Sequence, residues 1–184
     1  MKYLKILFQS KFSECHKTWE LIKVCPLTKY LQEISRREDK EKGVNSFLNS
    51  EFAPFSFKNK NLFSQEYDDL YSSSKGAVEE SEFVFINGNN LDQRFKEFQK
   101  DSTFYIGEIG FGVGINFLTT CRSWLNKSEN NQVLEFYSFD KYLFKLEDFK
   151  TILGKYPELH QYSLELEKNY PKNVKGIQKI PLFE

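Results

Sequence analysis

The residues best suited to chemistry lie in a glycine-rich turn, Glu108-Ile109-Gly110-Phe111-Gly112-Val113-Gly114. This turn joins an apolar, strand-like segment to a segment with helical spacing. Glycines let the backbone turn sharply and let a ligand approach it closely. The start of the following helix offers unpaired N–H groups and a positive dipole end. Such an arrangement suits an anionic group, either a pyrophosphate or the carboxylate of a methionine.

The spacing of the glycines and of a later acid helps to choose the ligand. Dinucleotide sites favour G-x-G-x-x-G, whereas this turn has G-x-G-x-G preceded by Glu108. Asp140 follows the next strand-like segment, 30 residues after Gly110 (140 minus 110), where a carboxylate can accept both hydroxyls of a ribose. The combination favours S-adenosylmethionine over a nucleotide cofactor. A purely structural turn beside an unrelated surface acid is the third reading, because a lone glycine loop is a weak signal.

The elements around this turn alternate between strand and helix. Strands are expected over 103–106, 133–139 and 174–183, and helices over 115–125, 146–156 and 157–166. Alternation of this kind predicts parallel βαβ units and an α/β fold. Upstream, the sequence predicts a strand over 83–86, a turn over 87–90 and a helix over 91–98.

The first 50 residues differ in character from the rest. Leu27, Tyr30, Leu31 and Ile34 recur with helical spacing, so residues 1–50 are expected to form an N-terminal helical extension. Residues 51–184 are expected to form the α/β unit, with a β-rich segment at its start.

The amino-acid composition excludes some classes of function. The chain of 184 residues carries 26 Lys and Arg against 26 Asp and Glu. This balance excludes a strongly basic chain that holds nucleic acid by bulk electrostatics, but it leaves room for a local basic patch. No apolar run is long enough for a membrane span, and lysines interrupt the N-terminal apolar stretches, so no export signal is expected. The three cysteines, an odd number without C-x-x-C spacing, fit reduced thiols in a cytoplasmic protein without a metal site.

Four ordered motifs carry a family resemblance. Glu108 to Leu118, read as E-x-G-F-G-x-G-x-N-F-L, resembles the first methyltransferase motif of the bacterial MnmC family, whose standalone relatives are called MnmD. The resemblance extends to three further segments, in order Tyr67 to Ser72, Gly76 to Asn89 and Tyr137 to Lys141. It covers residues 53–184.

The resemblance implies a partial Rossmann-like class I methyltransferase fold and a specific reaction. Members of the family methylate 5-aminomethyl-2-thiouridine of tRNA to 5-methylaminomethyl-2-thiouridine, with S-adenosylmethionine as donor. The residues implied to bind the donor are Glu108, Gly110, Gly112, Gly114, Asn116 and Asp140. Asp68, Asp69 and Tyr71 are assigned to the substrate side, where they are expected to meet the acceptor amine or to close over the donor, although capping of a turn explains the Asp pair equally well. The FAD-dependent oxidase domain of two-domain members has no counterpart, so no FAD is expected.

The sequence departs from the family pattern in several places, one of them Ser73, which stands near an asparagine-containing turn of the family. Val113 replaces a threonine, and Asp140 replaces a glutamate. The family's catalytic aspartate and later strands are expected beyond Glu184, so no catalytic residue is assigned. One edge of the strand over 103–106 should then be open, and we expect this chain to be inactive alone. The alternatives are one subunit of a split methyltransferase, completed by a second polypeptide, and a non-catalytic module that binds S-adenosylmethionine.

Overall fold

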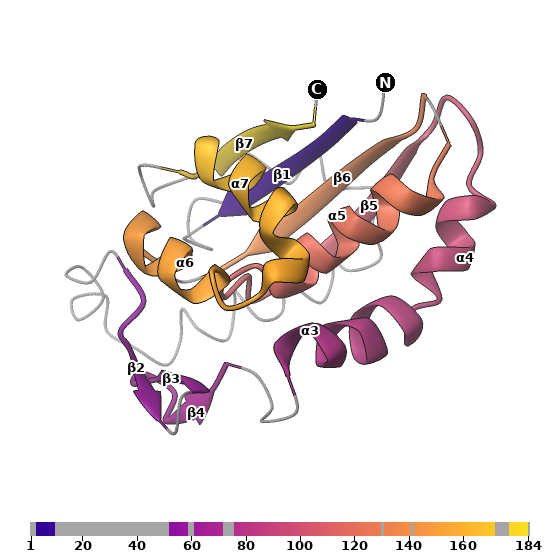
Figure 1. Cartoon of the computed structure of the whole chain (residues 1–184). Coiled ribbons are helices and arrows are strands. Elements are labelled where there is room, and N and C mark those ends of the chain that lie inside the picture. Colours follow the sequence, from indigo (N-terminus) through magenta and orange to yellow (C-terminus); the bar gives the residue numbers. More distant parts are fainter. Residues whose placement is uncertain are drawn as a thin grey trace, which may run out of the picture.

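Figure 1 shows the structure, a computed structural model of the chain. It describes residues 3–9, 52–58, 61–71, 76–129, 131–140, 142–171 and 177–183, with residues 3–9 and 177–179 described by their backbone alone. The expected helix over 27–34 and two of the three cysteines, Cys15 and Cys25, lie outside these residues. Among the described residues, no helix is long and apolar enough to cross a membrane.

The main sheet of the described part has four strands in the order β5-β6-β1-β7. They are β5 (Thr103–Ile109), β6 (Val133–Phe139), β1 (Tyr3–Gln9) and β7 (Ile177–Leu182). β5, β6 and β1 run parallel and are aligned residue for residue, while β7 runs antiparallel to β1. The expected α/β class with a partial Rossmann-like parallel sheet is confirmed.

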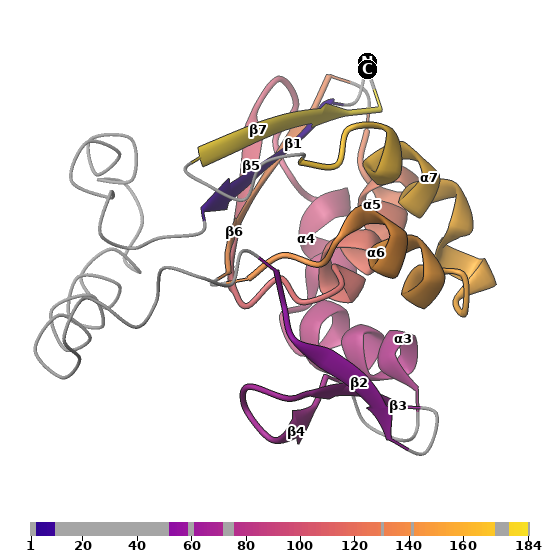
Figure 2. The same ribbon diagram turned by 90° about the vertical axis from the view of Figure 1, so that its left-hand side faces the viewer.

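Three helices cover one face of this sheet (Figure 2). They are α5 (Ile115–Lys127), α6 (Leu146–Leu153) and α7 (His160–Lys168), which follows the short 3-10 turn Pro157–Leu159. In β5 and β6 the even-numbered residues are buried towards these helices. Alternate side chains of a strand point to opposite faces, and on the opposite face Tyr105 and Ile109 are exposed.

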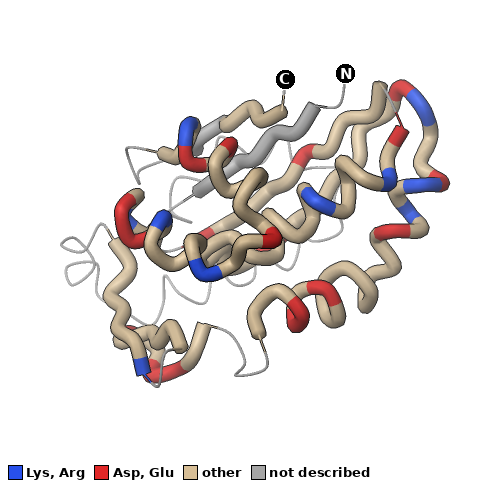
Figure 3. The backbone as a smooth tube through the Cα atoms, viewed as in Figure 1, with Lys and Arg blue, Asp and Glu red and all other residues tan. Residues whose placement is uncertain are grey.

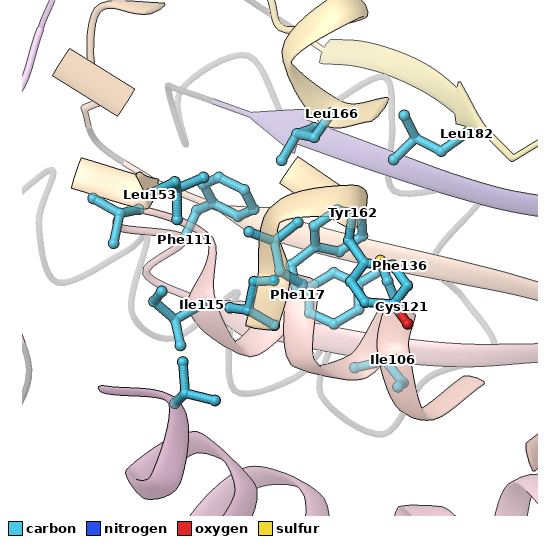
Figure 4. Packing of buried hydrophobic residues seen from close by; sticks show 14 of the residues in the cluster. Ile106, Phe111, Ile115, Phe117, Cys121, Phe136, Leu153, Tyr162, Leu166 and Leu182 are labelled. Atoms are coloured by element: carbon cyan, nitrogen blue, oxygen red, sulfur yellow. The ribbon is translucent and has the colours of Figure 1, made fainter. Parts of the chain in front are cut away.

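The core lies between the sheet and the helices, where large apolar side chains from distant segments meet (Figure 4). Phe136 of β6 has no exposed surface, and its ring centroid lies 5.1 Å from that of Phe117 on α5. A second aromatic group joins Phe95, Phe104 and Trp124, with centroids 5.0 Å apart between Phe95 and each of the other two rings. The aromatic-rich composition thus forms the core that holds β5, β6 and α5 together.

The segment before β5 corrects one expectation, because residues 83–86 are not a strand. The chain forms α3 (Ala77–Glu80), continues as the π-helix η2 (Ser81–Asn87), and then forms α4 (Leu91–Lys96) as expected. Phe83 accepts an i→i+5 hydrogen bond from the amide of Gly88 (3.1 Å). Val78, Ser81 and Ile86 are buried while Phe83 is exposed, so burial follows helical spacing and overrides the β-rich composition.

A small antiparallel sheet precedes this helical segment. It contains β2 (Phe55–Lys58), β3 (Asn61–Ser64) and β4 (Asp69–Leu70) in that order. It is tied to the loop after β6: Phe52 forms an isolated bridge with Leu143, and the Ala53 amide donates to the Leu143 carbonyl (2.9 Å). The expected β-rich segment therefore lies against the carboxyl end of the main sheet.

The ends of the described chain meet in the main sheet, which sequence reasoning did not predict. Tyr3–Gln9 lies within the expected helical extension but forms a strand between β6 and β7. Ile177–Leu182 is a strand, within the expected range, but it runs antiparallel to β1. Both results depend on pairing between residues at opposite ends of the chain, which local patterns do not encode. The boundary at residue 50 stays a prediction.

Replacing Phe136 by Ala should lower the free energy of unfolding by about 3–5 kcal/mol, because it leaves a cavity among fully buried rings. Urea denaturation followed by circular dichroism measures this change. The control is Tyr105→Ala on the exposed face of the sheet, where 63% of the residue is accessible and the loss should stay below about 1.5 kcal/mol. Equal losses for the two variants would contradict the described core.

Candidate functional site

The predicted donor-binding residues converge at the carboxyl ends of β5 and β6. Ile109 and Phe139 are paired at the ends of the two parallel strands, so Gly110 and Asp140 leave the sheet side by side. The amide of Gly110 donates to the Phe139 carbonyl (2.7 Å), and the amide of Gly112 donates to Asp140 Oδ2 (2.7 Å). Two segments that are far apart in the sequence thus form one site.

Asp140 is held by main-chain groups on both sides. Its Oδ2 atom accepts from Gly112, and its Oδ1 atom accepts from the amide of Tyr142 (3.0 Å). These two bonds fix the orientation of the carboxylate. The carboxylate is therefore oriented at the glycine turn, as a ribose-binding acid requires.

The turn itself needs its glycines. Gly110, Gly112 and Gly114 have φ values of 87°, 54° and 75°, a region that favours glycine. A Cβ on Gly114 would lie 2.6 Å from Cζ of the buried Phe111 ring, so this glycine is required by packing as well. A Cβ on Gly110 would meet no heavy atom within 4 Å, so the backbone there borders open space.

Glu108 lies beneath the turn, and 7% of the residue is exposed. Its carboxylate accepts from Asn116 Nδ2 (2.9 Å), in the first turn of α5, and from Ser138 Oγ (3.0 Å) on β6. Burial raises the pKa of Glu108 to about 7, although these two hydrogen bonds oppose the rise. Glu108 therefore joins β5, α5 and β6 at the base of the site.

Sequence reasoning missed Ser138. The signal was present, because strand alternation places Ser138 on the buried face with Leu134 and Phe136. A hydroxyl at a position expected to be buried needs a polar partner, and Glu108 is that partner.

The three residues expected on the substrate side separate into two groups. Asp68 and Asp69 are exposed. Asp68 has a φ of 53°, and Asp69 Oδ1 accepts from the amide of Leu70 (2.7 Å), which fits the capping interpretation. Tyr71 instead lies at the glycine turn, because a Cβ on Gly112 would be 3.5 Å from Tyr71 Cδ1. The structure thus brings Tyr71, but not the Asp pair, into described contact with the turn.

Charged residues of both signs are interspersed over the described backbone (Figure 3). Lys58 lies on β2, whereas Arg94 and Lys96 lie on α4, at separate places in the view. Lys100 pairs with Glu129 (2.9 Å). In the described part of the chain, Lys58 on β2 therefore lies apart from the cations on and after α4.

Glu108→Gln should change how stability depends on pH. Because the native pKa of about 7 lies above the ordinary value of 4.5, the native state binds the proton more tightly than the unfolded state does. Glu108 should therefore reduce the free energy of unfolding as pH rises from about 4.5 to 7, by on the order of 3 kcal/mol. Urea unfolding at intervals between pH 4.5 and 8 measures the slope. The free energy of unfolding of the Gln variant should not show this decrease with pH. If it changes with pH in the same way for both proteins, the raised pKa of Glu108 is contradicted.

Several known proteins resemble this chain in sequence. No family model matches the chain. Curated relatives include proteins named tRNA 5-methylaminomethyl-2-thiouridine biosynthesis bifunctional protein MnmC. That of Nitrosospira multiformis is 36% identical over 120 residues, which are 65% of this chain and 19% of the relative. That of Marinobacter nauticus is 37% identical over 122 residues, with the same coverage.

Among solved structures, MnmC2 from Aquifex aeolicus matches with a TM-score of 0.47 and 20% identity, over 82% of this chain and 53% of that chain. The chain spans about a fifth of the length of the MnmC relatives above. The resemblance predicted from the four motifs is confirmed, because over about two thirds of its own length this chain is similar in sequence to the MnmC proteins.

Proposed function

We propose that the chain carries the donor-binding part of an S-adenosylmethionine-dependent methyltransferase of the class I type. The observation that carries this proposal is the 2.7 Å hydrogen bond that joins the glycine turn to Asp140. When bound, S-adenosylmethionine supplies an electrophilic methyl group on a sulfonium. Asp140 would accept the ribose hydroxyls, and the glycine turn with the start of α5 would receive the methionine carboxylate.

The residues present fit such a ligand. The open space beside Gly110 allows close approach to the backbone. Asp140 is oriented at the turn by two amides. Glu108 and Asn116 are joined by a hydrogen bond. They would act by holding the glycine turn against α5, and not by taking part in the methyl transfer.

The acceptor proposed is tRNA. The names of the MnmC relatives refer to biosynthesis of 5-methylaminomethyl-2-thiouridine in tRNA, and this supports methylation of 5-aminomethyl-2-thiouridine at the wobble position. The acceptor amine must be neutral to attack the methyl group. Asp68 and Asp69 are the described carboxylates proposed to meet the substrate, and a cytoplasmic location follows from a tRNA substrate.

Asp140→Ala should weaken binding of S-adenosylmethionine at least tenfold, because it removes the acceptors for the ribose and the bond that closes the turn. Isothermal titration calorimetry measures the dissociation constant. Glu147→Ala is the control, since this carboxylate lies on the exposed side of α6 and pairs only at 3.8 Å with Lys150. No heat with the unchanged chain at millimolar ligand would contradict a donor site.

The second candidate is one subunit of a split methyltransferase. In the described sheet β5 is an edge strand, and it carries the glycine turn. In open parallel sheets the ligand binds in a crevice at the carboxyl ends of two neighbouring strands, at the place where the order of the strands reverses. A second polypeptide that pairs with the free edge of β5 would complete this crevice, and it would cover an edge prone to aggregation.

The 184-residue chain alone should transfer no methyl group to tRNA that contains 5-aminomethyl-2-thiouridine, because β5 forms only one wall of the crevice. Transfer of a radiolabelled methyl group from S-adenosylmethionine measures the activity. Binding of S-adenosylmethionine without transfer would fit either a subunit or a non-catalytic module. Unaided turnover would show that the described half-site is sufficient and would overturn the split-subunit proposal.

A further inference from the structure

Tyr71 occupies a place that its position in the sequence does not suggest. It follows β4 of the small sheet, yet its ring lies against the glycine turn of the main sheet, where a Cβ on Gly112 would be 3.5 Å from Tyr71 Cδ1. The ring is half-buried. A side chain from one sheet is therefore held over the functional turn of the other.

The ring is held there by Phe144. The Tyr71 and Phe144 centroids are 5.3 Å apart with the rings nearly edge to face, a favourable aromatic geometry. Phe144 is 1% exposed, packs against Phe55 of β2 at 5.2 Å, and its carbonyl accepts from the hydroxyl of Tyr170 (3.0 Å). Because Phe144 is fixed from two sides, the Tyr71 ring has a rigid support.

Asp140 contacts the same glycine. Its carboxylate accepts from the Gly112 amide, while a Cβ on Gly112 would lie 3.5 Å from Cδ1 of the Tyr71 ring. Burial raises the pKa of the Tyr71 hydroxyl, and the negative charge of Asp140 raises it further. An aromatic ring and a fixed carboxylate thus both lie beside one glycine.

The Tyr71 ring, the Asp140 carboxylate and Gly112 together suit the base and the ribose of a nucleoside. A ribose needs acceptors for its hydroxyls, and a purine is held by an aromatic side chain on which it can stack. Glycine lets both approach the backbone. We infer that Tyr71 belongs to the donor side of the site, where its ring contacts the adenosine part of S-adenosylmethionine. This inference rests on the proposed donor site, and of the two expected roles of Tyr71 it selects contact with the donor over contact with the acceptor amine.

The test compares two ligands on three variants by isothermal titration calorimetry. S-adenosylhomocysteine contains the whole donor skeleton, and 5′-methylthioadenosine lacks the amino-acid part. Tyr71→Leu should weaken both ligands by the same factor, roughly tenfold, because the stacking ring is lost. Tyr71→Phe should bind both within about twofold of the unchanged chain, because the proposed contact uses the ring and not the hydroxyl.

Phe57→Leu is the matched control. Phe57 belongs to the same small sheet, is 46% exposed and packs edge to face on Phe55, so it reports general loosening of that sheet. It should leave both dissociation constants unchanged. Circular dichroism of each variant checks that the fold is retained.

The outcomes separate the inference from the proposed function. If the unchanged chain binds neither ligand, the donor site itself fails. If the unchanged chain binds both ligands and Tyr71→Leu binds them equally well, the ring makes no contact with the ligand. If Tyr71→Leu binds them more tightly, the ring obstructs the site. Either result overturns the inference. A loss confined to S-adenosylhomocysteine would place the ring at the amino-acid part and would also overturn it.

Discussion

The residue-for-residue parallel pairing of β5 with β6 is the constraint on which the site depends. Because Ile109 and Phe139 end their strands as partners, Gly110 and Asp140 emerge together. A slip of one residue would turn every side chain of a strand to the other face. It would place Phe136 outside the core and remove Ser138 from Glu108. The buried aromatic rings therefore enforce the register, and the register builds the site.

The site holds two carboxylates in different environments. Glu108 is buried with two donors and has a raised pKa, while Asp140 is held by main-chain amides at the turn. The negative charge of Asp140 adds to the rise in the pKa of Glu108. Protonation of Glu108 near neutral pH limits repulsion between the two groups and limits the cost of burying a charge. One carboxylate thus serves the architecture, and the other is the one proposed to bind the ligand.

The small sheet extends the site beyond the βα unit. It is fixed to the loop after β6 by the Ala53–Leu143 hydrogen bond and by the packing of Phe55 on Phe144. That docking carries Tyr71 to the glycine turn. On the opposite side, β5 is an edge strand of the described sheet and exposes Tyr105. The described site is therefore enclosed on the side of β6 and open on the outer side of β5.

The sequence alone determined the α/β class, the strands and helices after residue 101, the glycine turn with Asp140, and the family resemblance. These rest on local periodicity, on backbone conformations that only glycine adopts readily, and on ordered motifs. Tertiary structure decided what depends on distant packing: the π-helix over residues 81–87, the strand Tyr3–Gln9 between β6 and β7, the role of Ser138, and the position of Tyr71. A segment rich in Phe and Val takes its conformation from the surface that buries it, and that surface exists only after the chain has folded.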